Sequence, residues 1–211
     1  MCGRYVFSMG LYRVAEEFHV EEVDGECGAG SEISPGQQVV AVVRHDRNRL
    51  VNFRWGLIPS WAKDPSIGRK MFNARAETVA EKPSFRSAFR DRRCLVIAEG
   101  FYEWQKLGKA KKPMLIRLKS GRPFGFAGLY ETWVSPDGET VRSCTIITTE
   151  ANELIRPIHD RMPVILPAKN EAAWLAPENR DSRALLSMLK PYPAAEMEME
   201  EVKPLSFAGC K

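Results

Sequence analysis

Seven short segments rich in β-branched and aromatic residues follow one another along the middle of this 211-residue chain. They cover residues 39–43, 50–55, 94–98, 114–118, 124–130, 141–148 and 164–166. Turn-forming residues separate several of them, as in Ser-Gly-Arg-Pro at 120–123 and Ser-Pro-Asp-Gly at 135–138, and this combination is typical of β-strands. None of these segments approaches the roughly 20 apolar residues that a membrane-spanning helix needs, so no such helix is expected.

Helical patterns border the expected strands. Residues 11–20 place apolar side chains at the i, i+3, i+4, i+7 spacing of one helix face. Further short helices are expected at 150–155, 171–175 and 182–189, the last of them ended by Pro191. We therefore expect an α+β fold in which short helices flank a curved, mainly antiparallel sheet or an open β-barrel.

The composition is that of an ordinary globular chain, with 44% hydrophobic and 27% charged residues, which argues against a disordered, collagenous or coiled-coil protein. The length fits one domain covering residues 1–211, because domains usually contain roughly 100–200 residues. The formal net charge of +4 is a mild basic surplus, which is compatible with a polyanionic partner but does not demand one.

The five cysteines are dispersed and form no C-x-x-C pair: Cys2, Cys27, Cys94, Cys144 and Cys210. The three histidines also lie far apart, so no metal site is expected. Because the chain begins without the apolar core of a secretory signal, these cysteines indicate reduced thiols and a cytoplasmic protein. Cys94 and Cys144 lie inside apolar runs, and we expect both in the core.

Cys2 differs from the other cysteines because it directly follows Met1. Removal of Met1 would leave Cys2 with an α-amine of pKa roughly 7.7–8.0 beside a thiol of pKa about 8.5. With an aldehyde, such an amine forms a Schiff base and the thiol then closes a thiazolidine ring; alternatively, the amine serves as the base for its own thiol nucleophile. An incidental cysteine is the third interpretation, and a retained Met1 would block both chemistries.

The polar run Asn-Ala-Arg-Ala-Glu-Thr at residues 73–78 is a candidate binding segment. Asn73 can both donate and accept hydrogen bonds, and Arg75 can hold a phosphate through two N–H groups. The alternative is a helix start with solvated charges.

Two titratable residues lie next to apolar segments. Glu103 stands between aromatic residues after the strand 94–98, surroundings that raise the pKa of a carboxyl group toward the range of acid–base catalysis. A glutamate on the wet face of a strand is the alternative. His159, flanked by charge and by an apolar run, is a candidate proton shuttle, although a lone histidine is more often structural.

Residues 53–61 interleave aromatic side chains with Gly, Pro and Arg. If Trp55 and Trp61 are exposed beside Arg54, they form a stacking platform for single-stranded nucleic acid; buried core tryptophans are the alternative. Residues 106–113 contain four lysines and are expected to form a basic hairpin loop. Four arginines are expected to form a solvated basic face: Arg86, Arg90, Arg92 and Arg93.

Taken together and in this order, these motifs resemble the SOS-response-associated peptidase family. The matching segments are Cys-Gly-Arg at 2–4, Trp-Gly-Leu-Ile-Pro at 55–59 with Trp61, Asn-Ala-Arg-Ala-Glu at 73–77, Arg-Cys-Leu at 93–95 leading to Gly-Phe-Tyr-Glu-Trp at 100–104, and His-Asp-Arg-Met-Pro-Val at 159–164. Five ordered motifs are not expected to match by chance.

The resemblance implies an intracellular sensor of abasic sites in single-stranded DNA. Its N-terminal cysteine bonds to the ring-opened deoxyribose aldehyde and leaves a covalent DNA–protein crosslink that shields the lesion. Associated lyase activity at abasic sites and a peptidase activity that removes the protein's own first residue are implied as well. Single-stranded DNA is the implied partner, a monomer suffices for one lesion, and the chemistry requires no cofactor or metal.

Carried over residue by residue, the resemblance makes Cys2 the nucleophile and has Asn73 position its amine and the sugar. Glu103 exchanges protons during Schiff-base and ring formation, and His159 assists sugar ring opening or strand-cleaving β-elimination. Phosphate contacts are implied for three arginines and base contacts for two tryptophans: Arg4, Arg75, Arg161, Trp55 and Trp61.

The chain departs from the family pattern in two places. Residues 31–36 are Ser-Glu-Ile-Ser-Pro-Gly, where family members usually carry a Tyr-Asn-x-Ala-Pro-like segment, and a charge at Glu32 near phosphates would weaken DNA binding. Ile97 stands where many relatives have a proline. The change at Glu32 bears on DNA affinity or substrate detail, whereas the change at Ile97 does not touch the expected chemistry.

Two other functions remain open from the sequence. Glutamine amidotransferases also begin Met-Cys-Gly, but this chain contains no Asn-Gly dipeptide for the expected oxyanion-hole loop. A non-covalent module for single-stranded DNA, with Cys2 incidental, would bind intact and abasic strands equally, with an affinity that falls steeply with salt.

Overall fold

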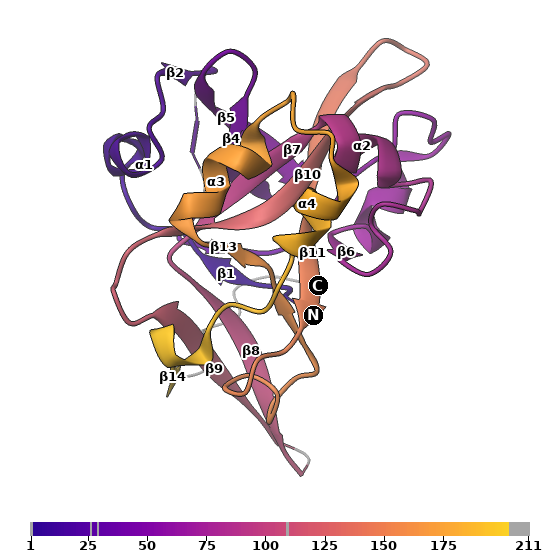
Figure 1. The fold of residues 1–211 in the computed structure, drawn as a ribbon. Coiled ribbons are helices and arrows are strands. Elements are labelled where there is room, and N and C mark those ends of the chain that lie inside the picture. Colours follow the sequence, from indigo (N-terminus) through magenta and orange to yellow (C-terminus); the bar gives the residue numbers. More distant parts are fainter. Residues whose placement is uncertain (1, 26, 29, 109, 203–211) are drawn as a thin grey trace.

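The computed structural model describes residues 2–25, 27–28, 30–108 and 110–202. Cys210 lies outside these ranges. Within them, no helix is long and apolar enough to cross a membrane. Figure 1 shows a strand-rich body with short helices around it and a long hairpin that extends from one end.

Five strands form a closed ring at the centre of the body: β4 (Gln38–Arg44), β5 (Asn48–Trp55), β7 (Arg93–Ala98), β10 (Phe124–Val134) and β11 (Thr140–Glu150). Neighbouring strands pair antiparallel in the order β11-β10-β7-β4-β5. The ring closes where β5 and β11 pair in parallel, with Cys144 opposite Trp55. The expected α+β fold with a barrel-like sheet is confirmed, and the barrel is closed.

The central strands are buried on both faces, which explains their almost continuous apolar sequences. All six residues of β7 are buried, as are five consecutive residues of β4. Cys94 and Cys144 lie in this core with no exposed surface, as expected.

A second sheet contains five strands in the order β14-β9-β8-β1-β3. Their bounds are β14 (Met197–Glu201), β9 (Ala110–Leu118), β8 (Gly100–Leu107), β1 (Tyr5–Val6) and β3 (Glu32–Ile33). The pairing of Tyr5 with Phe101 attaches the N-terminal segment to β8. The expected basic loop is instead mostly strand, because β8 and β9 pair as far as Leu107 and Ala110.

Four short strands complete the sheets: β2 (Glu22–Val23), β6 (Asn73–Arg75), β12 (Arg161–Pro163) and β13 (Ile165–Leu166). Two of them flank the far end of β11. β6 pairs with residues 146–148 of β11 in parallel, and β12 pairs with residues 148–150 antiparallel. The alternative of a helix start at 73–78 is therefore wrong, because this edge of β11 takes up the backbone of Asn73 and its neighbours.

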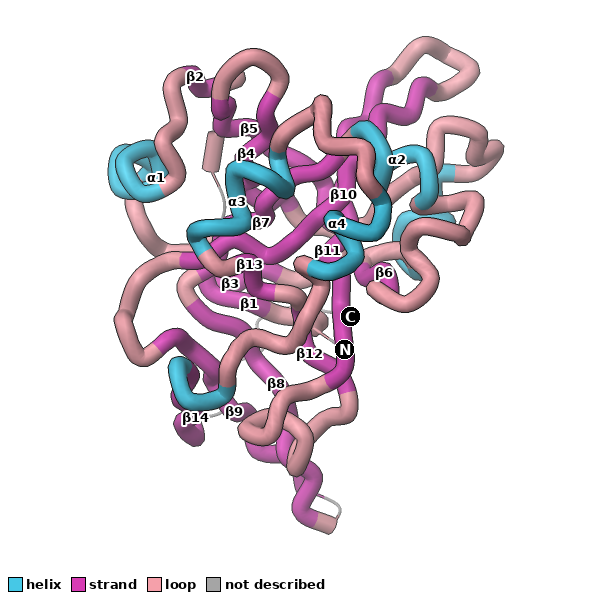
Figure 2. The backbone as a smooth tube through the Cα atoms, viewed as in Figure 1, coloured by secondary structure: helices cyan, strands magenta, loops and turns pink. Residues whose placement is uncertain are grey.

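The helices are short: α1 (Leu11–Glu17), α2 (Arg86–Asp91), α3 (Ala168–Leu175) and α4 (Ser182–Ser187), with 3-10 turns η1 (Pro65–Lys70) and η2 (Ala194–Glu196). Helices α2 and α3 pack on β7 and β10 (Figure 2). The helix expected at 150–155 is wrong. The Asn152 side chain accepts from the backbone of Ile155 and forms a turn, and Pro157 disfavours helical geometry at the residue before it.

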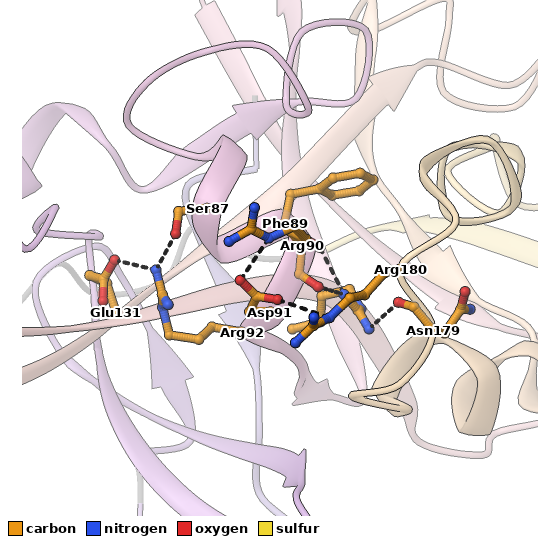
Figure 3. A network of polar contacts seen from close by, with 9 residues as sticks. Ser87, Phe89, Arg90, Asp91, Arg92, Glu131, Asn179 and Arg180 are labelled. Carbon is orange, nitrogen blue, oxygen red and sulfur yellow. Dashed lines mark hydrogen bonds and ion pairs between the residues drawn. The ribbon is translucent and has the colours of Figure 1, made fainter.

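Of the four arginines expected on a solvated face, Arg86 and Arg90 are exposed, whereas Arg92 and Arg93 join elements of the fold. Arg93 is 4% exposed and donates to five backbone carbonyls: Phe89, Arg90, Trp174, Ala176 and Asn179. Arg92 pairs with Glu131 at 2.8 Å. Figure 3 shows this network between α2 and the segment after α3. The expectation of solvation is wrong for Arg93, whose side chain stabilises the packing of both segments.

Candidate functional site

The N-terminal segment runs beside β6. Cys2 is completely buried, and its carbonyl oxygen accepts a hydrogen bond from Nδ2 of Asn73 at 2.7 Å. Asn73 is the first residue of β6 and lies opposite Ile146 of β11. Pairing with the central barrel therefore fixes the amide that holds Cys2.

Glu103 approaches Cys2 through the pairing of β1 with β8. The N–H of Tyr102 donates to the carbonyl of Arg4 at 2.9 Å, so the antiparallel register continues toward the chain start and brings Cys2 toward Glu103. Burial raises the pKa of the Cys2 thiol well above its ordinary value, and the negative charge of Glu103 raises it further. Cys2 therefore holds its proton in this environment.

The Glu103 side chain lies in surroundings that disfavour its charge. The residue is 4% exposed, and burial raises the pKa of its carboxyl group to about 7 because an ionised carboxylate loses its hydration. Glu103 can thus both donate and accept a proton near neutral pH. This agrees with the interpretation of Glu103 as a desolvated carboxylate rather than one on a wet face.

His159 faces the same cleft as Glu103. This cleft has a volume of about 420 Å³ and is lined by Glu103, Trp104, Lys106, Lys111, Ile158, His159 and Asp160. The backbone N–H of Arg161 donates to Nδ1 of His159 at 2.9 Å, and burial lowers the pKa of the imidazole. Because Nδ1 accepts, the neutral ring carries its proton on Nε2. Oδ1 of Asp160 is 3.0 Å from Nδ1, but that carboxylate is largely exposed, so water screens it.

The three arginines with expected phosphate contacts differ in their surroundings. Arg161 binds both oxygens of Glu77, at 2.5 and 2.9 Å, and the carbonyl of Thr148 at 2.6 Å. Its hydrogen bonds lower the pKa of Glu77. Arg4 lies 3.7 Å from Glu32, and Arg75 is exposed on β6. Glu32 therefore sits beside one of the expected phosphate contacts.

The two tryptophans with expected base contacts differ in exposure. Trp55 is 1% exposed, its Nε1 donates to the carbonyl of Phe72 at 2.7 Å, and its ring packs on Tyr5. The expectation that Trp55 stacks on bases is wrong for this structure, because neither face of its ring is open. Trp61 is 59% exposed, and its base contact stays a prediction.

The structure brings two residues to the cleft that the sequence did not assign to it. Lys106 and Lys111 line it beside His159. The run of lysines at 106–113 was the signal available in the sequence, but it did not indicate which of them face the cleft. Within the described ranges, no group of three histidine, cysteine or acidic side chains could hold a metal ion.

The chain is similar to known proteins along nearly its whole length. The family model described as SOS response associated peptidase (SRAP) matches residues 1–205. The abasic site processing protein YoqW of Bacillus subtilis is 48% identical over 209 residues, which cover 97% of this chain and 93% of the relative. The abasic site processing protein HMCES of Xenopus tropicalis is 37% identical over 139 residues, covering 56% of this chain and 42% of the relative. A crystal structure of a protein from Bacteroides thetaiotaomicron superposes with a TM-score of 0.88 at 29% identity, covering 96% of this chain and 92% of the other.

Proposed function

This chain belongs to the SOS response associated peptidase family, and from that premise we propose that it senses abasic sites in single-stranded DNA and bonds covalently to them through Cys2. The observation that carries the proposal is the convergence of four side chains from distant parts of the sequence. Asn73 holds Cys2, Glu103 acts electrostatically on Cys2, and Glu103 and His159 line one open cleft. The relatives named abasic site processing proteins supply the substrate class.

The proposed reaction begins with removal of Met1, which converts the peptide nitrogen of Cys2 into an α-amine. This amine attacks the aldehyde of the ring-opened deoxyribose, and loss of one water gives a Schiff base. The thiol then adds to the same carbon, its proton passes to the nitrogen, and a thiazolidine closes. The linkage thus forms with the net loss of one water and needs no oxidant or cofactor.

Glu103 moves the protons in this sequence. With a pKa of about 7, its acid form protonates the departing hydroxyl group and its carboxylate then accepts a proton. The second role matters because the buried Cys2 holds its proton, and a thiol is a weaker nucleophile than a thiolate. General acid–base catalysis of this kind contributes roughly 10²–10⁴-fold to a rate.

His159 supplies the second proton site. Its Nε2–H is the group left to donate once Nδ1 accepts from Arg161, and it assists opening of the sugar ring. The same imidazole, acting on the Schiff base, promotes β-elimination and gives the associated lyase activity. Removal of the chain's own Met1 is the peptidase activity that we propose.

In this proposal, exposed groups outside the cleft also hold the DNA strand. Arg75 binds a phosphate, and Trp61 stacks on a base. Arg161 contributes a phosphate contact only by exchanging part of its pairing with Glu77. The whole chain, residues 1–211, acts as one domain on this substrate, and one copy is sufficient for one lesion.

The direct test is a crosslinking assay with Cys2→Ala. Protein is incubated with a single-stranded oligonucleotide that contains an abasic site, and covalent product is separated on a denaturing gel. The matched control is Cys27→Ala, because Cys27 is a half-buried free thiol elsewhere in the chain. We expect a gel-stable product for the wild type and for Cys27→Ala, and none for Cys2→Ala.

Mass spectrometry completes the test. The mature protein should lack Met1, and the product should weigh one water less than the sum of protein and oligonucleotide. A crosslink that survives Cys2→Ala, or equal non-covalent binding of intact and abasic strands with no crosslink, would overturn the proposal. The second result would support the non-covalent binding module.

A further inference from the structure

Two lysines face each other on the hairpin that extends from the second sheet. In the antiparallel register of β8 and β9, Lys106 is the direct partner of Lys111. Both side chains are exposed, and both line the cleft with Glu103 and His159. Figure 1 shows this hairpin extending beyond the body, next to the loop that follows β11.

These two ammonium groups differ from the neighbouring cations of β9 in their pairing. Within the described part of the chain, neither Lys106 nor Lys111 forms an ion pair, whereas nearby cations of β9 do pair with β14. Lys112 lies 2.9 Å from Glu201, and Arg117 lies 3.3 Å from Glu200.

Like charges directly opposite each other in an antiparallel pair destabilise it. The hairpin keeps this arrangement only at the wall of the cleft, and a bound anion would remove the repulsion. Burial lowers the pKa of the His159 imidazole, and the Lys106 ammonium adds a small contribution in the same direction, so this lysine lies within electrostatic reach of the imidazole. An anionic ligand placed here would therefore lie beside a proposed proton donor.

We propose that Lys106 and Lys111 bind the phosphodiester backbone of the strand next to the abasic site, each contacting one phosphate. The proposal rests on the proposed function, because it takes that strand to be the substrate. The hairpin then guides one arm of the DNA past Glu103 and His159 and adds a binding surface that the family motifs do not include.

The test measures how affinity depends on salt. The probe is a single-stranded oligonucleotide with a tetrahydrofuran analogue at the abasic position, which has no aldehyde and cannot crosslink. Its affinity is measured by fluorescence anisotropy between 50 and 200 mM salt. For single strands, each lost phosphate contact reduces the slope of log K against log salt by about 0.7. We expect Lys106→Gln/Lys111→Gln to reduce the slope by about 1.4, which corresponds to about 25-fold weaker binding at 0.1 M salt.

The matched control removes the same charge elsewhere. Lys112 pairs with Glu201, and Lys119 donates to the carbonyl of Ala195 at the far end of β9. Lys112→Gln/Lys119→Gln should leave the slope unchanged. A double arginine variant, Lys106→Arg/Lys111→Arg, should keep the wild-type slope.

Melting temperatures without DNA separate binding from structure. Because the lysines repel each other, Lys106→Gln/Lys111→Gln should melt at the wild-type temperature or above it. An unchanged salt slope in this variant, or an equal loss of slope in the control, would overturn the inference. If the wild type crosslinks normally and Lys106→Gln/Lys111→Gln keeps the wild-type salt slope, this inference alone is refuted. If the wild type does not crosslink but the variant has a reduced salt slope, the covalent function alone is refuted.

Discussion

Replacing Glu103 by glutamine should stabilise the folded protein at alkaline pH while it removes the proposed proton transfer. Burial raises the pKa of Glu103 from 4.5 to about 7, and such a difference corresponds to about 3 kcal/mol between the two protonation states. Glutamine has nearly the same shape and carries no charge. The substitution therefore removes the unfavourable ionisation without opening a cavity.

The sign of the effect follows from proton binding. Between pH 4.5 and about 7, the folded state holds a proton on Glu103 that the unfolded state has released, so the free energy of unfolding of the wild type falls as pH rises through this interval. Glu103→Gln lacks this contribution. Its stability relative to the wild type should be near zero at low pH and should grow to about 3 kcal/mol above the folded pKa.

The assay is urea unfolding of both proteins at pH 5 and pH 8.5, together with crosslinking rates over the same range. We expect the variant to be the more stable protein only at the higher pH, to crosslink roughly 10²–10⁴-fold more slowly, and to lose the titration near pH 7 from its rate profile. A variant less stable than the wild type at pH 8.5 would show that the protein stabilises the ionised carboxylate. Wild-type crosslinking rates would refute the catalytic role.

Three further substitutions test the structure and the strand contacts. Arg93→Met removes a donor from five carbonyls in buried or half-buried surroundings and should lower the free energy of unfolding by more than about 3 kcal/mol in urea titrations; a loss below about 1 kcal/mol would contradict a structural role. Gly56→Ala should also destabilise, by about 2 kcal/mol or more, because Gly56 has a φ of +134° and its added Cβ would lie 2.6 Å from the carbonyl oxygen of Gly68; an unchanged urea midpoint would argue against this close approach. Trp61→Ala should leave the melting temperature unchanged and weaken binding of single strands by about 1–3 kcal/mol in anisotropy titrations, and unchanged affinity would exclude Trp61 from the DNA-binding surface.

Local sequence patterns predicted the strands because a strand buried in the core has an apolar sequence of its own. The apolar run at 94–98 became β7, which is buried along its whole length. The turn-forming residues at 120–123 precede β10, and those at 135–138 lie between β10 and β11. Glu103 was identified from its place between aromatic residues after an apolar strand, although its immediate neighbours in β8 point to the opposite face of the strand.

Residues whose environment comes from distant segments could not be assigned in this way. Trp55 lies beside an arginine and a glycine in sequence, but the parallel pairing with Cys144 places it in the barrel wall. Arg93 belongs to a charged run, but its partners include carbonyls more than 80 residues away. The sequence around Trp55 does not indicate its strand pairing, and the sequence around Arg93 does not indicate its distant carbonyl partners.

The site itself depends on the same long-range pairing. The end of β11 extends past the barrel, and its two edges hold β6 with Asn73 on one side and β12 with Arg161 on the other. Strands of three residues have little stability of their own, so these side chains keep their positions only while β11 is formed. Cys2 is attached through β1 to the other sheet and through Asn73 to this one. The N-terminal segment therefore bridges both sheets, and this double attachment holds Cys2, the proposed nucleophile, where the charge of Glu103 acts on its thiol.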